Sequence, residues 1–348
     1  SLCYKKLSMS KKNSNVILRE EFKNFEDLSS IYATFKKKLN SLKKKTLLIA
    51  VSGGPDSLAL SALAKAYSYN TKCKIHYVLI NHNLRKNSTS EALSVKKLLK
   101  KNNINLIILK NKKLIKKNIQ SQAREIRYDL LTNFCKKKKI KIILTAHNLE
   151  DQVETFFIRL SRGSGLQGLS SMTEINRINK NITLVRPLLN IKKIQLTKIS
   201  KIIFKKYYKD PSNNDKKYLR TRIRDFRKTL EKSGINYDQI FKSIKNLGSS
   251  RDTLNLYFNK IYEEVTTIKN KQITISLKIF NNLNQEMKIK ILSKAIKVIS
   301  KSYYSTRSKK VVNLVDKIAK NNNVRLSLAG CLIIRQKKHI IIKKLKKS

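Results

Sequence analysis

Four short runs of Ile, Leu and Val recur in the first half of the chain, separated by polar segments. The runs are TLLIAV (46–51), IHYVLI (75–80), INLIIL (104–109) and IKIILT (140–145). Continuous apolar runs of this length are typical of strands that are buried on both faces of a parallel sheet. The intervening segments, such as SLALSALAKAYS and SQAREIRYDLLTNFCKK, have helical spacing. This alternation predicts a doubly wound α/β domain that binds its ligand beyond the carboxyl ends of the strands.

The second half of the chain has a different pattern. Helical patterns dominate from about residue 191 to about residue 320, and the segments VRLSL, CLIIR and HIIIKK then read as three strands. The turn-forming segment DPSNND marks a boundary near residues 210–225. We therefore predict an N-terminal tail at 1–19, which is left out of the fold prediction, an α/β domain at 20–215, and a mostly helical domain ending in a small β-sheet at 216–348.

Charge and composition narrow the class of protein. The 348 residues include 78 Lys and Arg and 22 Asp and Glu, which gives a formal net charge of +56. Counterion release favours a polyanionic partner for such a chain, although a general bias toward Lys, Asn and Ile is an alternative source of the charge. No apolar run is long enough for a membrane span or a secretory signal, so we expect a cytoplasmic protein with no membrane partner. The four scattered cysteines lack metal-site spacing.

The segment SGGPDS follows the first predicted strand and opens the first predicted helix. Its residues are Ser52, Gly53, Gly54, Pro55, Asp56 and Ser57. A glycine-rich turn at a helix N-terminus presents backbone N–H groups to an anion, so we expect a phosphate there. The alternative is a tight turn in which Asp56 or Ser57 caps the helix. The lysine and the spacing of a Walker A loop are absent.

The segment LEDQVETFFIRL carries a rare group of acidic residues. Its apolar residues form one helical stripe, and Asp151 and Glu154 lie off that stripe, just after the fourth predicted strand. Carboxylates at this edge of the sheet are suited to binding an ammonium group. The alternative is that they compensate the helix dipole while Asn148 caps the helix.

Several segments resemble known families. SGGPDS matches the SGGxDS signature of the N-type ATP pyrophosphatases, or PP-loop enzymes. Five further segments resemble, in the same order, blocks of the tRNA(Ile)-lysidine synthase family: INHNLRKNSTSEA (80–92), NIQSQAREIRYDLL (118–131), TAHNLEDQVETFFIRLSRGSGLQGL (145–169), RPLL (186–189) and DPSNNDKKYLRTRIR (210–224). Four positions depart from the family pattern: Asn81, Asn83, Asn148 and Glu150 stand where aspartate, glycine, histidine and aspartate are usual. The roles of Asn81, Asn148 and Glu150 are left open.

The resemblance implies a PP-loop fold, which is adenine nucleotide α-hydrolase-like, and an ATP-dependent ligase that forms a C–N bond. Such an enzyme adenylates the wobble cytidine in the CAU anticodon of an isoleucine tRNA. Free L-lysine then attacks C2 and AMP leaves, so that lysidine forms and AUG reading becomes AUA reading. The resemblance assigns ATP binding and catalysis to residues 20–215 and tRNA binding to residues 216–348.

The resemblance also assigns roles to individual residues. It implies that Asp151 and Glu154 bind lysine and that the SGGPDS loop binds ATP. Because a carboxylate beside phosphates needs a cation between them, we expect Asp56 to hold Mg²⁺. Candidate contacts to nucleotide or tRNA are Arg124, His147, Arg220 and Arg224, with surface arginines and an ordinary strand-end histidine as the alternatives. Arg220, Arg224 and Arg227 share one helical face, which suits RNA phosphates or simply solvent.

Two other functions remain as alternatives. A PP-loop tRNA thiolation enzyme normally needs cysteines as sulfur carriers or cluster ligands, and the scattered cysteines speak against it. A non-enzymatic basic RNA-binding protein leaves the SGGPDS loop and the acidic group without a purpose. The sequence gives neither the oligomeric state, for which a homodimer is one option, nor the means of telling this tRNA from the methionine tRNA with the same anticodon.

Overall fold

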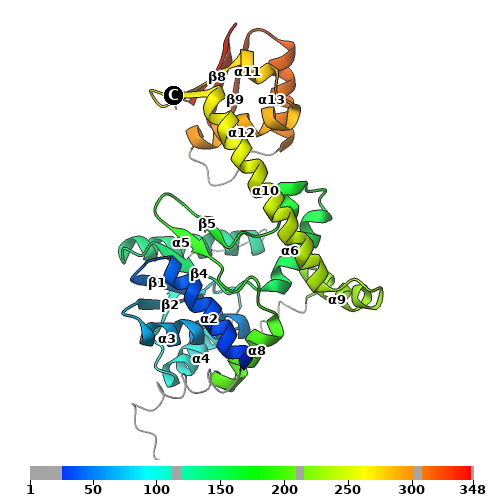
Figure 1. The fold of residues 1–348 in the computed structure, drawn as a ribbon. Coiled ribbons are helices and arrows are strands. Elements are labelled where there is room, and N and C mark those ends of the chain that lie inside the picture. The colour runs from blue at the N-terminus through cyan, green and yellow to red at the C-terminus, as the bar shows by residue number, and fades with distance from the viewer. Residues whose placement is uncertain (1–25, 86, 112–118, 209–214, 301–307, 346–348) are drawn as a thin grey trace, which may run out of the picture. The chain divides into compact units, whose positions relative to one another are not determined.

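The computed structural model describes residues 26–85, 87–111, 119–208, 215–300 and 308–345 (Figure 1). The chain divides into two compact units, residues 1–247 and 248–348. The division falls within the long helix α10 (Tyr237–Val265). The predicted tail at 1–19 lies outside the described residues.

The first unit is built on a six-stranded sheet with the strand order β3-β2-β1-β4-β6-β5. The strands are β1 (Thr46–Val51), β2 (Lys74–Asn81), β3 (Leu106–Lys110), β4 (Ile142–Leu144), β5 (Ile175–Arg177) and β6 (Thr183–Val185). All neighbouring pairs are parallel except β5 with β6. The helices are α2 (Glu26–Ser41), α3 (Pro55–Asn70), α4 (Ser88–Lys101), α5 (Ile119–Lys137), α6 (Leu149–Leu160), α7 (Leu166–Leu169), α8 (Lys193–Phe204) and α9 (Leu219–Lys232). The predicted parallel α/β fold is confirmed, with β5 and β6 as additions.

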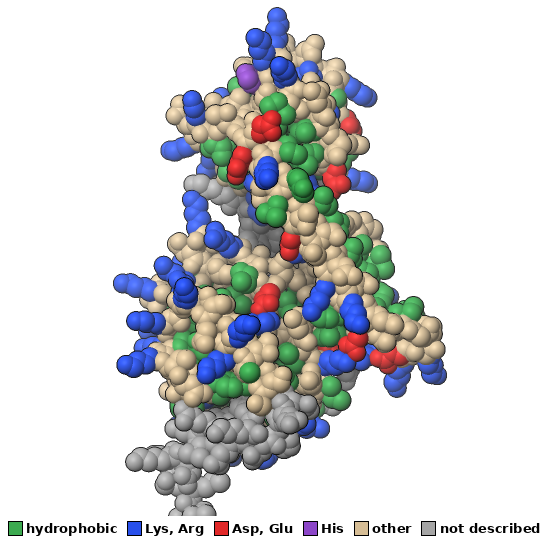
Figure 2. Space-filling model, viewed as in Figure 1, with side chains coloured by type: hydrophobic (Ala, Val, Ile, Leu, Met, Phe, Trp, Pro, Cys, Tyr) green, Lys and Arg blue, Asp and Glu red, His purple; other side chains and the backbone are tan. Residues whose placement is uncertain are grey.

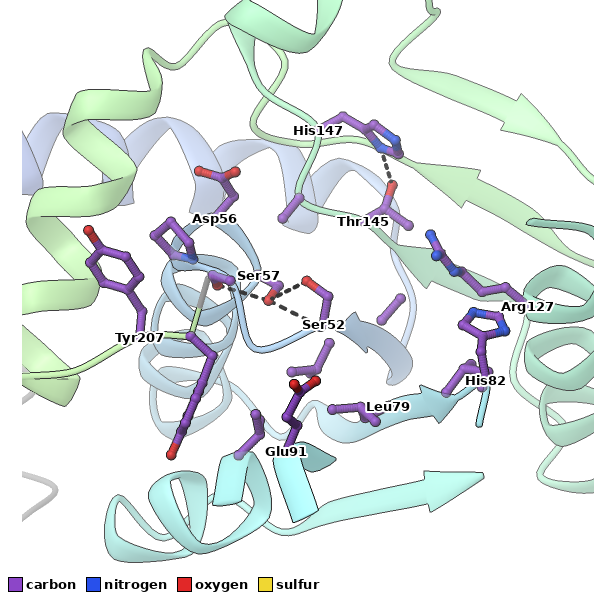
Figure 3. Close-up of a pocket in the computed structure, with 18 of the residues that line it drawn as sticks. Ser52, Asp56, Ser57, Leu79, His82, Glu91, Arg127, Thr145, His147 and Tyr207 are labelled. Atoms are coloured by element: carbon purple, nitrogen blue, oxygen red, sulfur yellow. Dashed lines mark hydrogen bonds between the residues drawn. The ribbon is translucent and has the colours of Figure 1, made fainter. Parts of the chain in front are cut away.

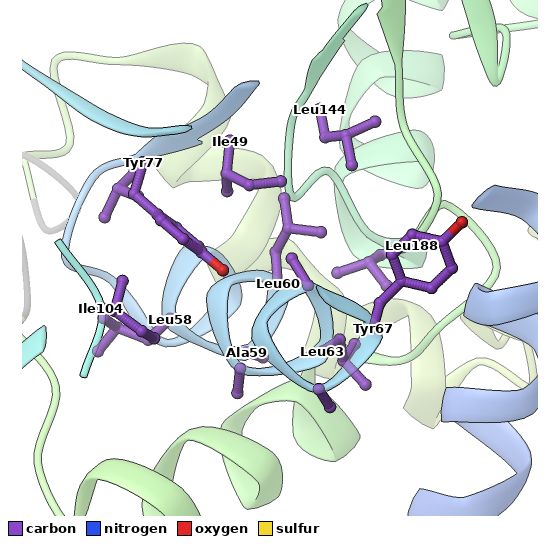
Figure 4. Close-up of a cluster of buried hydrophobic side chains, with 14 of the residues drawn as sticks. Ile49, Leu58, Ala59, Leu60, Leu63, Tyr67, Tyr77, Ile104, Leu144 and Leu188 are labelled. Carbon is purple, nitrogen blue, oxygen red and sulfur yellow. The ribbon is translucent and has the colours of Figure 1, made fainter. Parts of the chain in front are cut away.

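Burial on both faces of the sheet explains why the strands are continuous apolar runs. Along β1, Leu47 and Ile49 belong to the core on one face, and Leu48 belongs to the core on the other. Figure 4 shows the first of these cores, in which Leu58, Leu60 and other residues of α3 pack against the sheet. Because α3 is buried along much of its length and also packs against α8, the loop that joins β1 to α3 has a fixed position.

The second unit combines helices with an antiparallel sheet of order β7-β8-β11-β10-β9. Its elements after α10 are β7 (Thr266–Lys269), β8 (Gln272–Ser276), α11 (Leu277–Asn281), α12 (Gln285–Ser300), α13 (Ser308–Lys320), β9 (Val324–Leu328), β10 (Cys331–Arg335) and β11 (His339–Lys344). The last three strands match the prediction. The β7–β8 hairpin corrects it, because the sequence pattern predicts a helical region there.

The division between the units lies later than the boundary expected at 215/216. Helix α9 packs against α6, and the start of α10 joins the same apolar cluster, which includes Val153, Leu230 and Ile244. These residues bury the apolar stripe of α6, so they belong to the first unit. Except for Asp215, the predicted boundary segment DPSNND lies outside the described residues.

Basic side chains predominate on the surface. Figure 2 shows one face of the molecule, on which Lys and Arg greatly outnumber Asp and Glu. In the described part of the chain, no helix has both the length and the apolar character needed to cross a bilayer.

Candidate active site at the carboxyl edge of the parallel sheet

A pocket of about 1070 Å³ lies at the carboxyl ends of β1, β2 and β4 (Figure 3). Residues of α3, α4, α5, α6, α8 and α9 complete its wall. The pocket is lined by most of the predicted site residues, namely Ser52, Gly54, Pro55, Asp56, Ser57, Arg124, His147, Asp151, Arg220 and Arg224. Gly53 and Glu154 are buried and are not part of this lining. The fold thus brings segments from four separate regions of the chain to one site.

The SGGPDS loop is held by its own serine. The Ser57 hydroxyl accepts hydrogen bonds from the backbone N–H groups of Ser52 and Gly53, each at 3.1 Å. The N-cap of α3 is Gly54, without a side-chain cap, so neither Asp56 nor Ser57 has the capping role considered as an alternative. The first N–H groups of a helix have no intrahelical partner, so the start of α3 offers donors at the pocket. These features suit the binding of an anion.

Glycine is required at position 53. Its φ is +87°, and a Cβ atom there would lie 2.6 Å from Cγ2 of Val95 on α4. Its carbonyl accepts a hydrogen bond from the N–H of Tyr208 at 3.0 Å. The backbone therefore takes a conformation, and passes through a space, that other residues do not tolerate.

Asp56 projects from the first turn of α3 into the pocket (Figure 3). Burial raises the pKa of this carboxyl group to about 7; nearby Lys193 opposes the shift, whereas Asp151 adds to it. Its Oδ1 atom is buried and has no hydrogen-bond partner. Among the described residues, no group of three or more His, Cys, Asp or Glu side chains could hold a metal ion. The unpaired oxygen fits a Mg²⁺ ion whose other ligands are phosphate oxygens and water.

Helix α6 begins with a capping box. The Asn148 side chain accepts a hydrogen bond from the Asp151 N–H at 2.9 Å, and the Asp151 carboxylate accepts one from the Asn148 N–H at 3.2 Å. The capping role considered for Asn148 is therefore present. Asp151 combines this role with a place in the pocket lining.

Glu154 is buried, with 3% of its surface exposed, and it is surrounded by arginines of α9. Its carboxylate contacts Nε of Arg224 at 2.5 Å and Nε of Arg220 at 3.0 Å. Burial raises the pKa of Glu154, and the hydrogen bond from Arg224 opposes that shift. Nη1 of Arg227 lies 3.7 Å from Oε1 of Glu150. The arginine face of α9 is thus paired with acids of α6, and Arg220 and Arg224 also line the pocket.

His147 and Arg124 line the pocket on the side of α5 and β4. Nδ1 of His147 lies 2.9 Å from the Thr145 hydroxyl. Burial lowers the pKa of His147 to about 4, and Asp151 opposes this shift. The imidazole is therefore neutral at pH 7. Arg124 lies over the ring of Tyr128, at 5.2 Å from its centroid.

Comparisons with known proteins agree with this geometry. The family described as "PP-loop domain" matches residues 28–229. The tRNA(Ile)-lysidine synthase of Wolbachia pipientis wMel is 34% identical over 299 residues, which cover 84% of this chain and 69% of that protein. The same enzyme of Orientia tsutsugamushi (strain Boryong) is 36% identical over 311 residues, covering 85% and 69%. The chain belongs to the tRNA(Ile)-lysidine synthase family. It is therefore an ATP-dependent ligase with a PP-loop ATP-binding domain.

A solved structure supports the fold independently. The U34-tRNA thiolase NcsA from Methanococcus maripaludis, solved with its [4Fe-4S] cluster, has a TM-score of 0.54 and 19% identity, and the match covers 64% of this chain and 78% of that one. At this identity the likeness concerns the fold alone. In this chain, Cys73, Cys135 and Cys331 are free and buried.

Asn81 departs from the family pattern and has a structural role here. It is buried at the end of β2, donates a hydrogen bond to the Thr89 hydroxyl at 3.0 Å, and accepts one from the Asn83 N–H at 2.9 Å. An amide can do both, whereas a carboxylate only accepts. Asn81 therefore ties the loop after β2 to the start of α4.

Two residues that line the pocket, His82 and Lys193, are not among the site residues predicted from the sequence. His82 follows β2, and both of its ring nitrogens are buried without a hydrogen-bond partner. Burial, reinforced by Arg127, lowers the pKa of His82 to about 4. In Figure 3, His82 and Arg127 lie on the side of the pocket away from Asp56. His82 lies two residues after the predicted strand 75–80, which was a usable signal. Lys193 offered no such signal, because it is one lysine among many.

Proposed function

We propose that this protein ligates free L-lysine to C2 of the wobble cytidine in the CAU anticodon of an isoleucine tRNA. ATP adenylates the cytidine first, and lysidine, AMP and diphosphate are the products. The observation that carries the proposal is the meeting of the SGGPDS loop with the carboxylates of Asp56 and Asp151 in one pocket. Family membership supplies the substrate class, because the relatives are tRNA(Ile)-lysidine synthases.

The chemistry has two steps. Oxygen O2 of the cytidine attacks the α-phosphorus of ATP, and diphosphate leaves. The ε-amine of lysine, having lost a proton, then attacks C2, and AMP leaves with the former O2. A site for both steps needs donors for phosphate and acceptors for ammonium, and both kinds of group line this pocket.

The phosphate side consists of the Ser52–Ser57 loop, with Arg124, Arg220 and Arg224 as further candidates. Asp56 would hold Mg²⁺ through its unpaired Oδ1 atom. When bound, this ion would neutralise phosphate charge and make the α-phosphorus a better electrophile. Neutral His147 would contact the adenylate as a hydrogen-bonding group.

The lysine side consists of Asp151 and Glu154. Asp151 faces the pocket and is the direct acceptor for the ammonium group. Glu154 becomes available only if Arg220 and Arg224 loosen their ion pairs with it. Both arginines line the pocket, so bound phosphates are the groups to which they would turn. We propose that this exchange opens the lysine site after the nucleotide has bound.

Two further proposals concern the part of the chain that binds tRNA and the place of the reaction in the cell. We propose that the basic C-terminal part of the chain contacts the tRNA and that the reaction takes place in the cytoplasm, where tRNA is used. Counterion release makes tRNA affinity strongly dependent on salt.

The proposal is tested with ATP, labelled lysine and an unmodified isoleucine tRNA transcript with a CAU anticodon. The expected result is incorporation of lysine that requires ATP, with the methionine tRNA transcript as the control. Asp151→Asn is expected to raise the KM for lysine far more than the KM for ATP. Sulfur incorporation in place of lysine would favour the thiolation enzyme, and RNA binding without any ATP binding or lysine incorporation would favour the RNA-binding protein. Absence of lysine incorporation by folded, ATP-binding enzyme contradicts the proposal.

A further inference from the structure

Lys193 enters the pocket from an element that neither the SGGPDS loop nor the acidic helix includes. It is the first residue of α8, it lines the pocket, and α8 packs directly against α3. Lys193 and Asp56 of the phosphate loop line the same pocket, and the charge of Lys193 acts to lower the pKa of the Asp56 carboxyl group. Within the described part of the chain, no carboxylate forms an ion pair with Lys193.

The neighbouring lysine has a different environment. Lys192 pairs with Asp238 at 2.7 Å, both side chains are about half exposed, and Lys192 does not line the pocket. Such an exposed pair contributes little to stability. Of these two adjacent lysines, Lys192 therefore forms a surface ion pair, whereas Lys193 lines the pocket.

Glu150 fixes the position of Lys193. Its side chain is buried at the start of α6, and its Oε2 atom accepts a hydrogen bond from the Lys193 N–H at 2.8 Å. The Leu149 N–H donates to the Ile191 carbonyl at 3.0 Å, which forms a second link between the same two segments. A buried charged acceptor makes a strong hydrogen bond, so the first turn of α8 is held against α6.

We propose that Lys193 is a further nucleotide-binding residue that contacts the phosphates of ATP opposite the Ser52–Ser57 loop, and that Glu150 is the positioning residue that holds it there. This inference rests on the proposed function in one respect, namely that the occupant of the pocket is ATP. Lys193 is then the cation that remains beside the phosphates while Arg220 and Arg224 are shared with Glu154. Glu150 does not line the pocket, and it acts on the nucleotide through its hydrogen bond to the backbone of Lys193.

The test measures binding by calorimetry, with an ATP analogue that carries a methylene group between the α and β phosphates. Lys193→Gln is expected to weaken this binding about 10- to 100-fold, the range for a lost charged hydrogen bond. The matched control Lys192→Gln removes the same charge one residue away and is expected to stay within about twofold. Equal affinities of the two variants for the analogue would overturn the proposal.

Glu150 is tested by its coupling to Lys193. Glu150→Ala is expected to weaken analogue binding several-fold, and Glu150→Gln, which retains an acceptor oxygen, to recover most of that loss. In the Lys193→Gln background, Glu150→Ala should have little further effect, because residues that act through each other are not additive. Additive losses would refute the positioning role. Lysine incorporation by the wild type is scored separately, so failure of the proposed function is recognised independently of these binding results.

Discussion

Replacing Gly53 with alanine tests the physical account of the phosphate loop. The substitution places a side chain at φ +87°, and such backbone strain costs about 1–3 kcal/mol. The new Cβ would also lie 2.6 Å from Cγ2 of Val95, well inside the separation of about 3.5–4.0 Å that carbon atoms prefer. Val95 is 2% exposed and cannot move into solvent, so relief of the overlap costs roughly another 1–3 kcal/mol.

The two effects together predict a loss of about 2–6 kcal/mol in the free energy of unfolding, a large part of the roughly 5–15 kcal/mol of a typical domain. Urea denaturation followed by circular dichroism measures this loss. Gly163→Ala is the matched control, because Gly163 has φ +66° and a Cβ atom added there would meet nothing within 4 Å. It therefore reports the backbone cost alone.

A second variant separates the steric part of the effect. Val95→Ala removes the atom that the new Cβ would meet, so the double variant should show a favourable interaction energy of about 1–3 kcal/mol relative to the two single variants. If Gly53→Ala is no more destabilising than Gly163→Ala, or if Val95→Ala brings no relief, the explanation from the close approach to α4 is refuted.

Three further predictions concern charge in the pocket. Chelation of Mg²⁺ should weaken ATP binding to the wild type at least about tenfold, and should have little effect in Asp56→Asn, as measured by calorimetry. Burial lowers the pKa of His147 from 6.5 to about 4, so the unfolded chain gains its proton first. The contribution of His147 to the free energy of unfolding should therefore fall by up to about 3 kcal/mol between pH 6.5 and pH 4. Asp56, whose pKa is raised to about 7, changes stability in the opposite sense over this range, so the His147 contribution is measured in urea titrations as the pH-dependent difference between wild type and His147→Gln. Glu154→Ala leaves Arg220 and Arg224 without their carboxylate; because these arginine side chains are 41% and 29% exposed, solvent screens part of the loss, and the cost in urea denaturation should be about 1–3 kcal/mol, below that of a fully buried pair. Unchanged stability would contradict a stabilising role for these ion pairs.

The first unit could be predicted because burial leaves a direct trace in the sequence. Leu48 and Ile49 face opposite cores, so no polar position interrupts the strand, and the run is recognisable without alignment. The β7–β8 hairpin leaves a weaker trace. Its turn places Asn270 and Lys271 at φ values of 49° and 60°, and a lysine at positive φ is an unusual turn residue. The sequence pattern therefore gives no clear sign of a hairpin within the helical region.

The sequence identified most residues of the candidate site, but it did not show which of them form ion pairs with one another. Spacing placed Arg220 and Arg224 on one helical face, as the structure has them, but spacing does not identify what a face contacts. Their partner, Glu154, lies on another helix and far away in the sequence. For the same reason Lys193 could not be singled out: only the packing of α8 against α3 brings it to the pocket.

Because the net charge is +56, basic residues are expected in any pocket of this protein, and the acidic side chains say more about what this pocket binds. A chain so basic attracts phosphate groups over much of its surface, and a pocket lined by cations alone would also hold the product diphosphate firmly. Asp56 and Asp151 reduce the positive field inside the pocket, and Glu154 ties down two arginines that would otherwise bind any anion. If Asp56 holds Mg²⁺ as proposed, retention of the phosphates would depend on a cation that can leave with diphosphate. Under the proposed function, the few acids would therefore explain how a phosphate-binding site in this protein releases its products and also accepts an amine.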